Sequence, residues 1–279
     1  MAPATDSETL IVQAARDIER RDAELLLAAA WNLSRGAWLA RAGEPVPEDV
    51  VARFDAWRAR RAAGEPVAYL LGRREFWSLT FEVTPAVLVP RPETELLVER
   101  VLERVPAIEA AVADLGTGSG AIAIALAHQR PRWRVLGTDR SAEALAVARR
   151  NGARLVGDRV EWRAGDWFQA LESRRFDALA SNPPYIEEND PVLAGDGLRH
   201  EPRGALTPGG DGFAALATLI NGAPDHLLPG GWLFLEHGAT QGAALRGALV
   251  ARGFTHVTSH RDLAGRERIT EGQISHARF

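Results

Sequence analysis

The chain has 279 residues, of which 46% are hydrophobic and 25% are charged, and its formal net charge is -4. This length suits one large domain or two modest ones, and the composition argues against a disordered, collagen-like or coiled-coil protein. The chain has no cysteine, and all 33 basic residues are arginine. Disulfides, thiolate nucleophiles, iron–sulfur sites, zinc ribbons and catalytic or phosphate-binding lysines are therefore excluded. The negative charge gives no reason to expect a nucleic acid partner.

Neither the interior of the sequence nor its start suggests a membrane. No apolar run approaches the roughly 18 residues that a membrane span needs. Residues 1–8 are polar and acidic and lack the order of a secretory signal. We expect a cytoplasmic protein without a membrane partner.

The first seventy residues show the periodicity of helices. Apolar side chains recur at spacings of three and four over residues 10–18 and 50–57, and residues 25–31 between them are almost entirely apolar. Residues 1–70 carry nine arginines against eleven carboxylates, so this part is not a basic clamp for nucleic acid. We predict a small helical domain over residues 1–75.

Residues 76–95 differ in pattern from the segments on either side. The sequence Trp77-Ser-Leu-Thr-Phe-Glu-Val alternates in the way of a β-strand, and Pro85, Pro90 and Pro92 interrupt the residues after it. We predict a β-hairpin here that also serves as the linker between two domains.

After Glu95 the pattern alternates between strands and helices. Strands are predicted at residues 111–115, 133–138, 159–163, 176–181 and 231–235, helices at 121–128, 141–151 and 241–252, and a terminal strand pair at 254–260 and 274–279. Such alternation indicates an α/β fold in which helices cover both faces of a largely parallel sheet. We predict a Rossmann-like domain of about seven strands over residues 96–279.

A glycine-rich loop joins the first of these strands to the first helix. It runs from Asp114 to Gly120 as Asp-Leu-Gly-Thr-Gly-Ser-Gly, and Asp139 closes the next strand. Glycines in this setting let a ligand approach the backbone N–H groups of the helix, and the acidic residue is placed to accept hydrogen bonds from ribose hydroxyls. The sequence predicts a nucleotide-type site, although a loop that only packs the helix on the sheet has the same pattern.

Asp166 and Trp167 follow the third predicted strand. In that position they would hydrogen-bond and stack on an adenine ring. The alternative is that Trp167 is an ordinary core residue.

The sharpest motif is Asn182-Pro-Pro-Tyr185, directly after the fourth strand. This is the edge at which open α/β sheets bind ligands. The prolines stiffen the turn and remove N–H donors, so the Asn182 side-chain oxygen and the Pro183 carbonyl can accept the two hydrogens of a planar NH₂ group while Tyr185 stacks on its face. The alternative is a proline turn that merely ends a strand.

With these motifs the chain resembles the class I S-adenosylmethionine-dependent methyltransferases. Among them it resembles the HemK or PrmC family of glutamine amide methyltransferases, which modify peptide-chain release factors. The resemblance covers most of the chain and includes, besides Asn182-Pro-Pro-Tyr185, residues 66–77, 89–95, 201–203, 235–238 and 262–268. One departure is Glu93, where the family more often has aspartate.

The resemblance implies a cofactor, a substrate and roles for single residues. The cofactor would be S-adenosyl-L-methionine, and the substrate would be the glutamine of the Gly-Gly-Gln segment of a class I release factor, docked in part by the helical domain. We expect a monomer that binds no nucleic acid directly. The implied site comprises Asp114, Gly116, Thr117, Gly118, Ser119, Gly120, Asp139, Asp166, Trp167 and Asn182 for the cofactor, Asn182, Pro183, Pro184 and Tyr185 for the glutamine, and Asn182, Pro183 and Tyr185 for catalysis.

Three other functions remain open on the sequence. A ribosomal-protein glutamine methyltransferase would share the catalytic half. An amino methyltransferase acting on adenine N6 in nucleic acid would meet the same NH₂ geometry, although it should carry a basic face. The third is a cofactor-binding module without catalysis.

Other segments carry weaker signals. His256 and His260 have the spacing of a metal pair on a helix, but their sequence is that of a strand, so we expect no metal. The arginines at 58, 60, 61, 73 and 74 are either a solvated face or a partner contact. Residues 187–210 are either a lid over the substrate groove or a plain surface loop.

Overall fold

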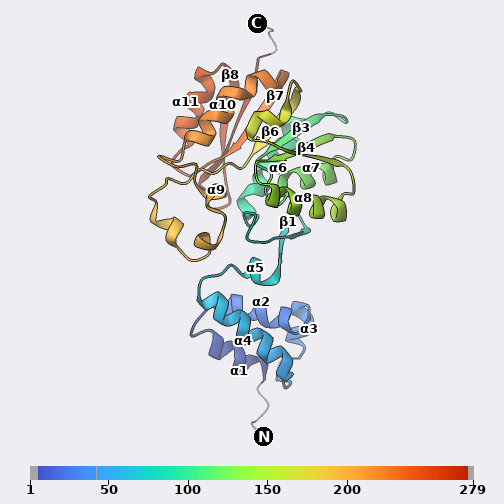
Figure 1. The fold of residues 1–279 in the computed structure, drawn as a ribbon, viewed down its shortest axis with the longest axis vertical. Coiled ribbons are helices and arrows are strands. Elements are labelled where there is room, and N and C mark those ends of the chain that lie inside the picture. The colour runs from blue at the N-terminus through green and yellow to red at the C-terminus, as the bar shows by residue number, and fades with distance from the viewer. Residues whose placement is uncertain (1–5, 42, 276–279) are drawn as a thin grey trace. The chain divides into compact units, whose positions relative to one another are not determined.

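A computed structural model describes residues 6–41 and 43–275, and the chain forms two compact units (Figure 1). The helical unit comprises the described residues up to Gly72 together with Gly195–His200, and the sheet unit comprises Arg73–Ala194 and the described residues from Glu201 onward. Among the described residues, no helix combines the length and the apolar character needed to cross a membrane.

The helical unit confirms the helical periodicity of the first seventy residues. Its helices are α1 (Ser7–Ala14), α2 (Arg20–Ala30), α3 (Arg35–Leu39), α4 (Glu48–Ala62) and α5 (Val67–Leu71). Asp6 caps α1 by accepting a hydrogen bond from the Thr9 N–H at 2.8 Å. The apolar faces of the helices meet in one core, which includes Leu10, Ile11, Leu26, Leu27, Val50 and Phe54.

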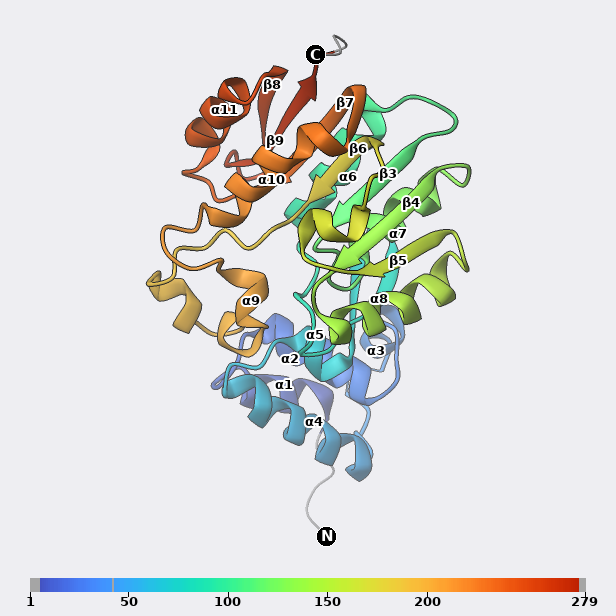
Figure 2. The same cartoon turned by 45° about the horizontal axis from the view of Figure 1, so that its top comes forward.

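The sheet unit contains a seven-stranded sheet in the order β5-β4-β3-β6-β7-β9-β8 (Figures 1 and 2). The first five strands in this order are parallel, and β9 is antiparallel to both of its neighbours. The bounds are β3 (Ala111–Leu115), β4 (Arg134–Asp139), β5 (Val160–Ala164), β6 (Phe176–Ser181), β7 (Leu227–Glu236), β8 (Phe254–Arg261) and β9 (Glu267–Ile274). The predicted Rossmann-like sheet is confirmed.

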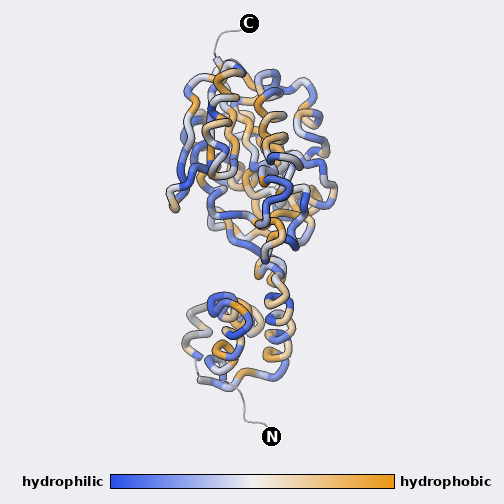
Figure 3. The backbone as a smooth tube through the Cα atoms, turned by 90° about the vertical axis from the view of Figure 1, so that its left-hand side faces the viewer, coloured by the Kyte–Doolittle hydropathy of each residue, from blue (hydrophilic) through white to orange (hydrophobic). Residues whose placement is uncertain are grey.

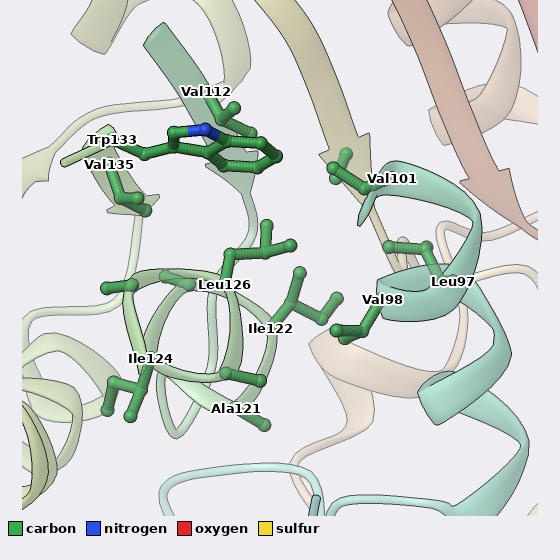
Figure 4. Packing of buried hydrophobic residues seen from close by; sticks show 14 of the residues in the cluster. Leu97, Val98, Val101, Val112, Ala121, Ile122, Ile124, Leu126, Trp133 and Val135 are labelled. Atoms are coloured by element: carbon green, nitrogen blue, oxygen red, sulfur yellow. The ribbon is translucent and has the colours of Figure 1, made fainter. Parts of the chain in front are cut away.

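Helices cover both faces of this sheet because successive strand residues point to opposite sides. One face packs on α6 (Glu95–Arg104), α7 (Ala121–Gln129) and α8 (Ala142–Leu155), and the other on α10 (Ala214–His226) and α11 (Gly242–Ala251). Figure 4 shows the first of these cores, with Ile122 of α7 facing Val98 of α6. In Figure 3 the hydrophobic colour is concentrated on inner stretches of the tube of the sheet unit, as expected where strands are buried on both faces.

The predicted hairpin is present, but its position along the chain differs from the prediction. The strands are β1 (Arg73–Phe76) and β2 (Leu79–Glu82), and Trp77 and Ser78 form the turn with φ of 54° and 57°. Two consecutive positive φ values are the mark of a type I′ turn, which usually contains Asn-Gly. Since Trp-Ser carries no such signal, the sequence pattern placed Trp77 in the strand.

The last predicted strand is wrong in position. The partner of β8 is β9, which ends at Ile274, whereas residues 276–279 of the predicted strand lie outside the described residues. The hydrophobic pattern did not predict β9, because buried polar residues, Thr270 and Glu271, occupy its centre. Helices α6 and α10 were not predicted either.

Candidate active site

A cavity of about 480 Å³ lies in the sheet unit where the strand order reverses, between β3 and β6. Open α/β folds bind ligands at this switch point, and the volume is within the ordinary range for small-molecule sites. Nine of the predicted site residues line the cavity: Gly116, Thr117, Gly118, Ser119, Asp139, Asp166, Trp167, Asn182 and Pro184. Asp114, Gly120, Pro183 and Tyr185 lie next to these residues but do not line it.

The glycine loop is held in a conformation that favours glycine. Gly116, Gly118 and Gly120 have φ of 74°, 56° and 84°. The Thr117 N–H donates to the Thr138 carbonyl at 2.7 Å, which fixes the loop to the end of β4. A Cβ on Gly116 would lie 3.4 Å from the Trp167 ring, so the loop and this ring are close-packed.

Asp114 lies beneath the loop, fully buried. One of its oxygens accepts hydrogen bonds from the Thr117 hydroxyl at 2.5 Å and from the Ala123 N–H at 3.2 Å. Its other oxygen has no hydrogen-bond partner among the residues that the structure describes. Burial raises the pKa of Asp114 to about 7. Through these two hydrogen bonds, Asp114 therefore supports both the loop and the first turn of α7 from the interior of the protein.

Asp139 lies at the end of β4 and lines the cavity. Its two oxygens accept hydrogen bonds from the Gly118 and Ser141 N–H groups, each at 2.9 Å. A carboxylate has about four acceptor positions, so Asp139 keeps capacity for ligand hydroxyls.

Asp166 and Trp167 stand together at the start of the 3₁₀-helix η2 (Trp167–Leu171), and both line the cavity. Trp167 adopts a left-handed backbone with φ of 47°, which is uncommon for a bulky residue. The ring also packs against the core beneath α10. It therefore fits both interpretations of the sequence, as a core residue and as a wall of the cavity.

Asn182 is tied to residues distant in the sequence. Its side-chain NH₂ donates to the Thr94 hydroxyl at 3.2 Å, and Thr94 donates to Glu236 at 2.7 Å. The other Glu236 oxygen accepts from the Tyr185 hydroxyl at 3.2 Å. Because its NH₂ is engaged, the amide oxygen of Asn182 is left for other partners. We call Thr94, Asn182, Tyr185 and Glu236 the amide cluster.

Glu236 is the shared hydrogen-bond acceptor of the amide cluster. Its side chain is buried, and this burial raises its pKa to about 7. Burial and the neighbouring Glu236 carboxylate raise the pKa of Tyr185. Tyr185 therefore stays a hydrogen-bond donor at neutral pH.

Another buried carboxylate, Glu201, lies behind the cavity wall and supports a residue that lines it. Glu201 accepts a hydrogen bond from the Val89 N–H at 3.0 Å and pairs with Arg91, which itself lines the cavity. Pro202, Gly204 and Ala205, at α9 (Arg203–Leu206), also line it. The segment expected to be a lid or a plain loop thus contains short helices, η3 (Pro191–Ala194), η4 (Leu198–His200) and α9, and only its residues from Pro202 onward line the cavity.

Sequence reasoning assigned no role to Thr94, Glu236, Arg91 or Glu201. All four lie inside the segments that carry the family resemblance, 89–95, 201–203 and 235–238. The family resemblance of these segments was therefore the one feature of the sequence that could have pointed to these four residues. Their roles depend on contacts between segments more than fifty residues apart, which no local pattern reveals.

The remaining candidates from the sequence do not line the cavity. His256 and His260 lie on β8, as predicted, and His260 contacts Glu271 at 3.3 Å. No group of three or more potential metal ligands is found among the described residues. Arg58, Arg60 and Arg61 of α4 are each paired with a carboxylate of the helical unit.

Two family models match the chain. Residues 7–72 match the PrmC N-terminal domain, and residues 92–214 match the methyltransferase small domain. The two matches together cover most of both units.

Comparisons with individual known proteins agree with these two family matches. The chain is 52% identical to the release factor glutamine methyltransferase of Pseudomonas aeruginosa, over 91% of this chain and 92% of that protein. It is 50% identical to the one of Xylella fastidiosa, over 95% and 96%. The catalytic domain of hMettl16, solved in complex with a MAT2A 3′UTR hairpin, shares the fold with a TM-score of 0.59 at 18% identity, over 79% of this chain and 82% of that one. The chain belongs to the release factor glutamine methyltransferase family.

Proposed function

We propose that the chain transfers the methyl group of S-adenosyl-L-methionine to the side-chain amide nitrogen of a glutamine in a class I peptide-chain release factor, the glutamine of its Gly-Gly-Gln segment. The observation that carries the proposal is Asn182, at the wall of the cavity with its NH₂ engaged and its oxygen left to accept from an amide. The names of the relatives supply the substrate class.

The residues present suit this cofactor. Gly116 and Gly118 leave the loop backbone uncovered, and the first turn of α7, at Ala121 and Ile122, presents N–H groups without acceptors inside the helix. Such groups bind carboxylate or phosphate oxygens. Asp139 would accept from the ribose hydroxyls, and Asp166 and Trp167 would contact the adenine. When bound, the cofactor would supply an electrophilic methyl group and be left as S-adenosylhomocysteine, and the methylated amide nitrogen would release one proton.

The chemistry explains why the site needs a rigid acceptor. An amide nitrogen is a poor nucleophile because its lone pair is delocalised into the carbonyl. Correct orientation of two reactants is worth roughly 7 to 11 kcal/mol, whereas a neutral hydrogen bond contributes about 0.5 to 1.5 kcal/mol. The Asn182 oxygen and the Pro183 carbonyl would therefore act mainly by aligning the amide, and they would also stabilise the positive charge that develops on its nitrogen.

We further propose that the helical unit docks the release factor. It matches the PrmC N-terminal domain, and its helix α4 carries balanced ion pairs in place of a free basic face. This charge pattern suits a protein partner better than a polyanion.

The test is transfer of labelled methyl from S-adenosylmethionine to a purified class I release factor. A release factor whose Gly-Gly-Gln glutamine is changed to alanine serves as the control. Label on the first and none on the second is expected. Equal labelling of both, or no labelling while the cofactor binds, would contradict the proposal.

A further inference from the structure

Glu236 is a buried carboxylate to which the proposed function gives no task. We propose that it is a positioning residue for methyl transfer: through Thr94 it holds the Asn182 side chain with the amide oxygen toward the substrate. This inference rests on the proposed function and adds a residue to it.

The direction of the hydrogen bonds supports this role. An ionised carboxylate only accepts, so when Glu236 is ionised the Thr94 hydroxyl donates to it at 2.7 Å and can then only accept from Asn182 at 3.2 Å. Asn182 therefore presents NH₂ to Thr94 and oxygen to the other side. If the Thr94 hydroxyl were absent, no acceptor at this position would favour the observed orientation of the Asn182 side-chain amide. The orientation with oxygen and nitrogen exchanged would then be about as stable.

The same carboxylate also holds the other end of the motif. Its second oxygen accepts from the Tyr185 hydroxyl at 3.2 Å, so one buried group is bonded to both Tyr185 and, through Thr94, Asn182. Hydrogen bonds to a charged acceptor are about twice as strong as neutral ones. The ionised form should thus fix the turn more firmly than the protonated form.

The charged surroundings of Glu236 come from three elements. Arg268 of β9 favours its ionised form, and Glu93, beside Thr94, opposes it. Tyr185 donates a hydrogen bond, and Arg91 lies near enough to Tyr185 to act on its ionisation. Because burial dominates and raises the pKa of Glu236 to about 7, this group gains and loses its proton in the range where the reaction would be measured.

A purely structural role would make different predictions. If Glu236 only stabilised the fold, its removal would lower the melting temperature without changing the rate of transfer by the folded protein or its dependence on pH. The two interpretations separate when folded protein is assayed in a single turnover.

The experiment compares wild type with Thr94→Val, Thr94→Ser and Glu236→Gln. Single-turnover transfer to the release factor is measured from pH 5.5 to 8.5 at saturating cofactor, and cofactor affinity is measured by calorimetry. Glu271→Gln is the matched control, since Glu271 is an equally buried carboxylate bonded to Arg100 and Arg104 outside the amide cluster.

The expected pattern is specific. Thr94→Val is slower by tenfold or more, Thr94→Ser stays within about threefold, and all variants bind cofactor within about threefold of wild type. The wild-type rate falls as pH drops below about 7, whereas Glu236→Gln is slow and lacks this acid limb. Equal rates for Thr94→Val and Thr94→Ser, or the same acid limb in Glu236→Gln and wild type, would overturn the inference. An inactive wild type would instead refute the proposed function.

Discussion

Two walls of the cavity are each supported by one buried carboxylate, but in different ways. Asp114 supports the glycine loop through Thr117 and Ala123, three and nine residues away in sequence. Glu236 supports the Asn182 turn through Thr94 and Tyr185, which are 142 and 51 residues away. The proposed cofactor wall, formed by the glycine loop, thus depends on contacts that are local in sequence. The proposed amide wall, at Asn182, forms only when distant segments come together.

This difference suggests that the two walls can be damaged separately. A change in the glycine loop or its neighbours should alter cofactor binding. A change in the amide cluster should alter transfer while the cofactor still binds.

The largest effect is expected for Asn182→Ala. Removing the acceptor should slow single-turnover transfer by about 10³-fold, the range seen when a group that stabilises developing charge is lost. Cofactor affinity should stay within a few-fold of wild type, as calorimetry would show. Full activity of Asn182→Ala would show that the Asn182 side chain is not needed for transfer and would contradict the proposed division between the two walls.

The second effect concerns stability and tests Asp114. Its folded pKa of about 7 lies above the usual value of 3.8, so the folded protein keeps a proton that the unfolded chain releases between these values. Asp114 therefore contributes stability below about pH 4, and this contribution is lost as pH rises to about 7, by up to about 4 kcal/mol.

Asp114→Asn cannot titrate, so it checks the sign of this effect. Urea unfolding at pH 5 and pH 8 should show the variant gaining stability relative to wild type at the higher pH. A constant difference between the two proteins would mean that Asp114 is ionised throughout.

A smaller effect is expected for Asp139→Ala. Loss of a carboxylate that accepts hydrogen bonds from ligand hydroxyls should weaken cofactor binding by about 10- to 100-fold. Each hydrogen bond to a charged group contributes about 1.5 to 3 kcal/mol. Asp158, exposed in a turn before β5, offers the matched control Asp158→Ala. If Asp139→Ala instead slowed transfer at saturating cofactor and left cofactor affinity unchanged, the assignment of Asp139 to cofactor binding would be wrong.

The smallest effect is expected for Trp167→Phe. The smaller ring keeps an aromatic face toward the cavity, so affinity for the cofactor should fall only about threefold. Trp167→Ala removes the ring altogether and should cost more. Identical affinities for the two variants would show that the ring serves only the core.

Much of the fold was predictable from local patterns. The strand and helix alternation after Glu95 predicted β3 to β8, since buried parallel strands are recognisable as short apolar runs. β9 was misplaced because its centre holds Thr270 and Glu271, whose burial depends on partners elsewhere, among them Arg100 and Arg104. The hairpin turn at Trp77 lacked the usual turn residues.

The candidate site divides along the same line. The glycine loop, Asp139 and the Asn182 motif could be predicted from local patterns, because each lies at a strand end whose position follows from periodicity. The link from Glu236 through Thr94 to Asn182, and the burial of Asp114 beneath its loop, are visible only in the folded chain. The reason is physical: periodicity encodes which face of an element is buried, whereas a hydrogen bond between distant segments depends on how the whole sheet is assembled.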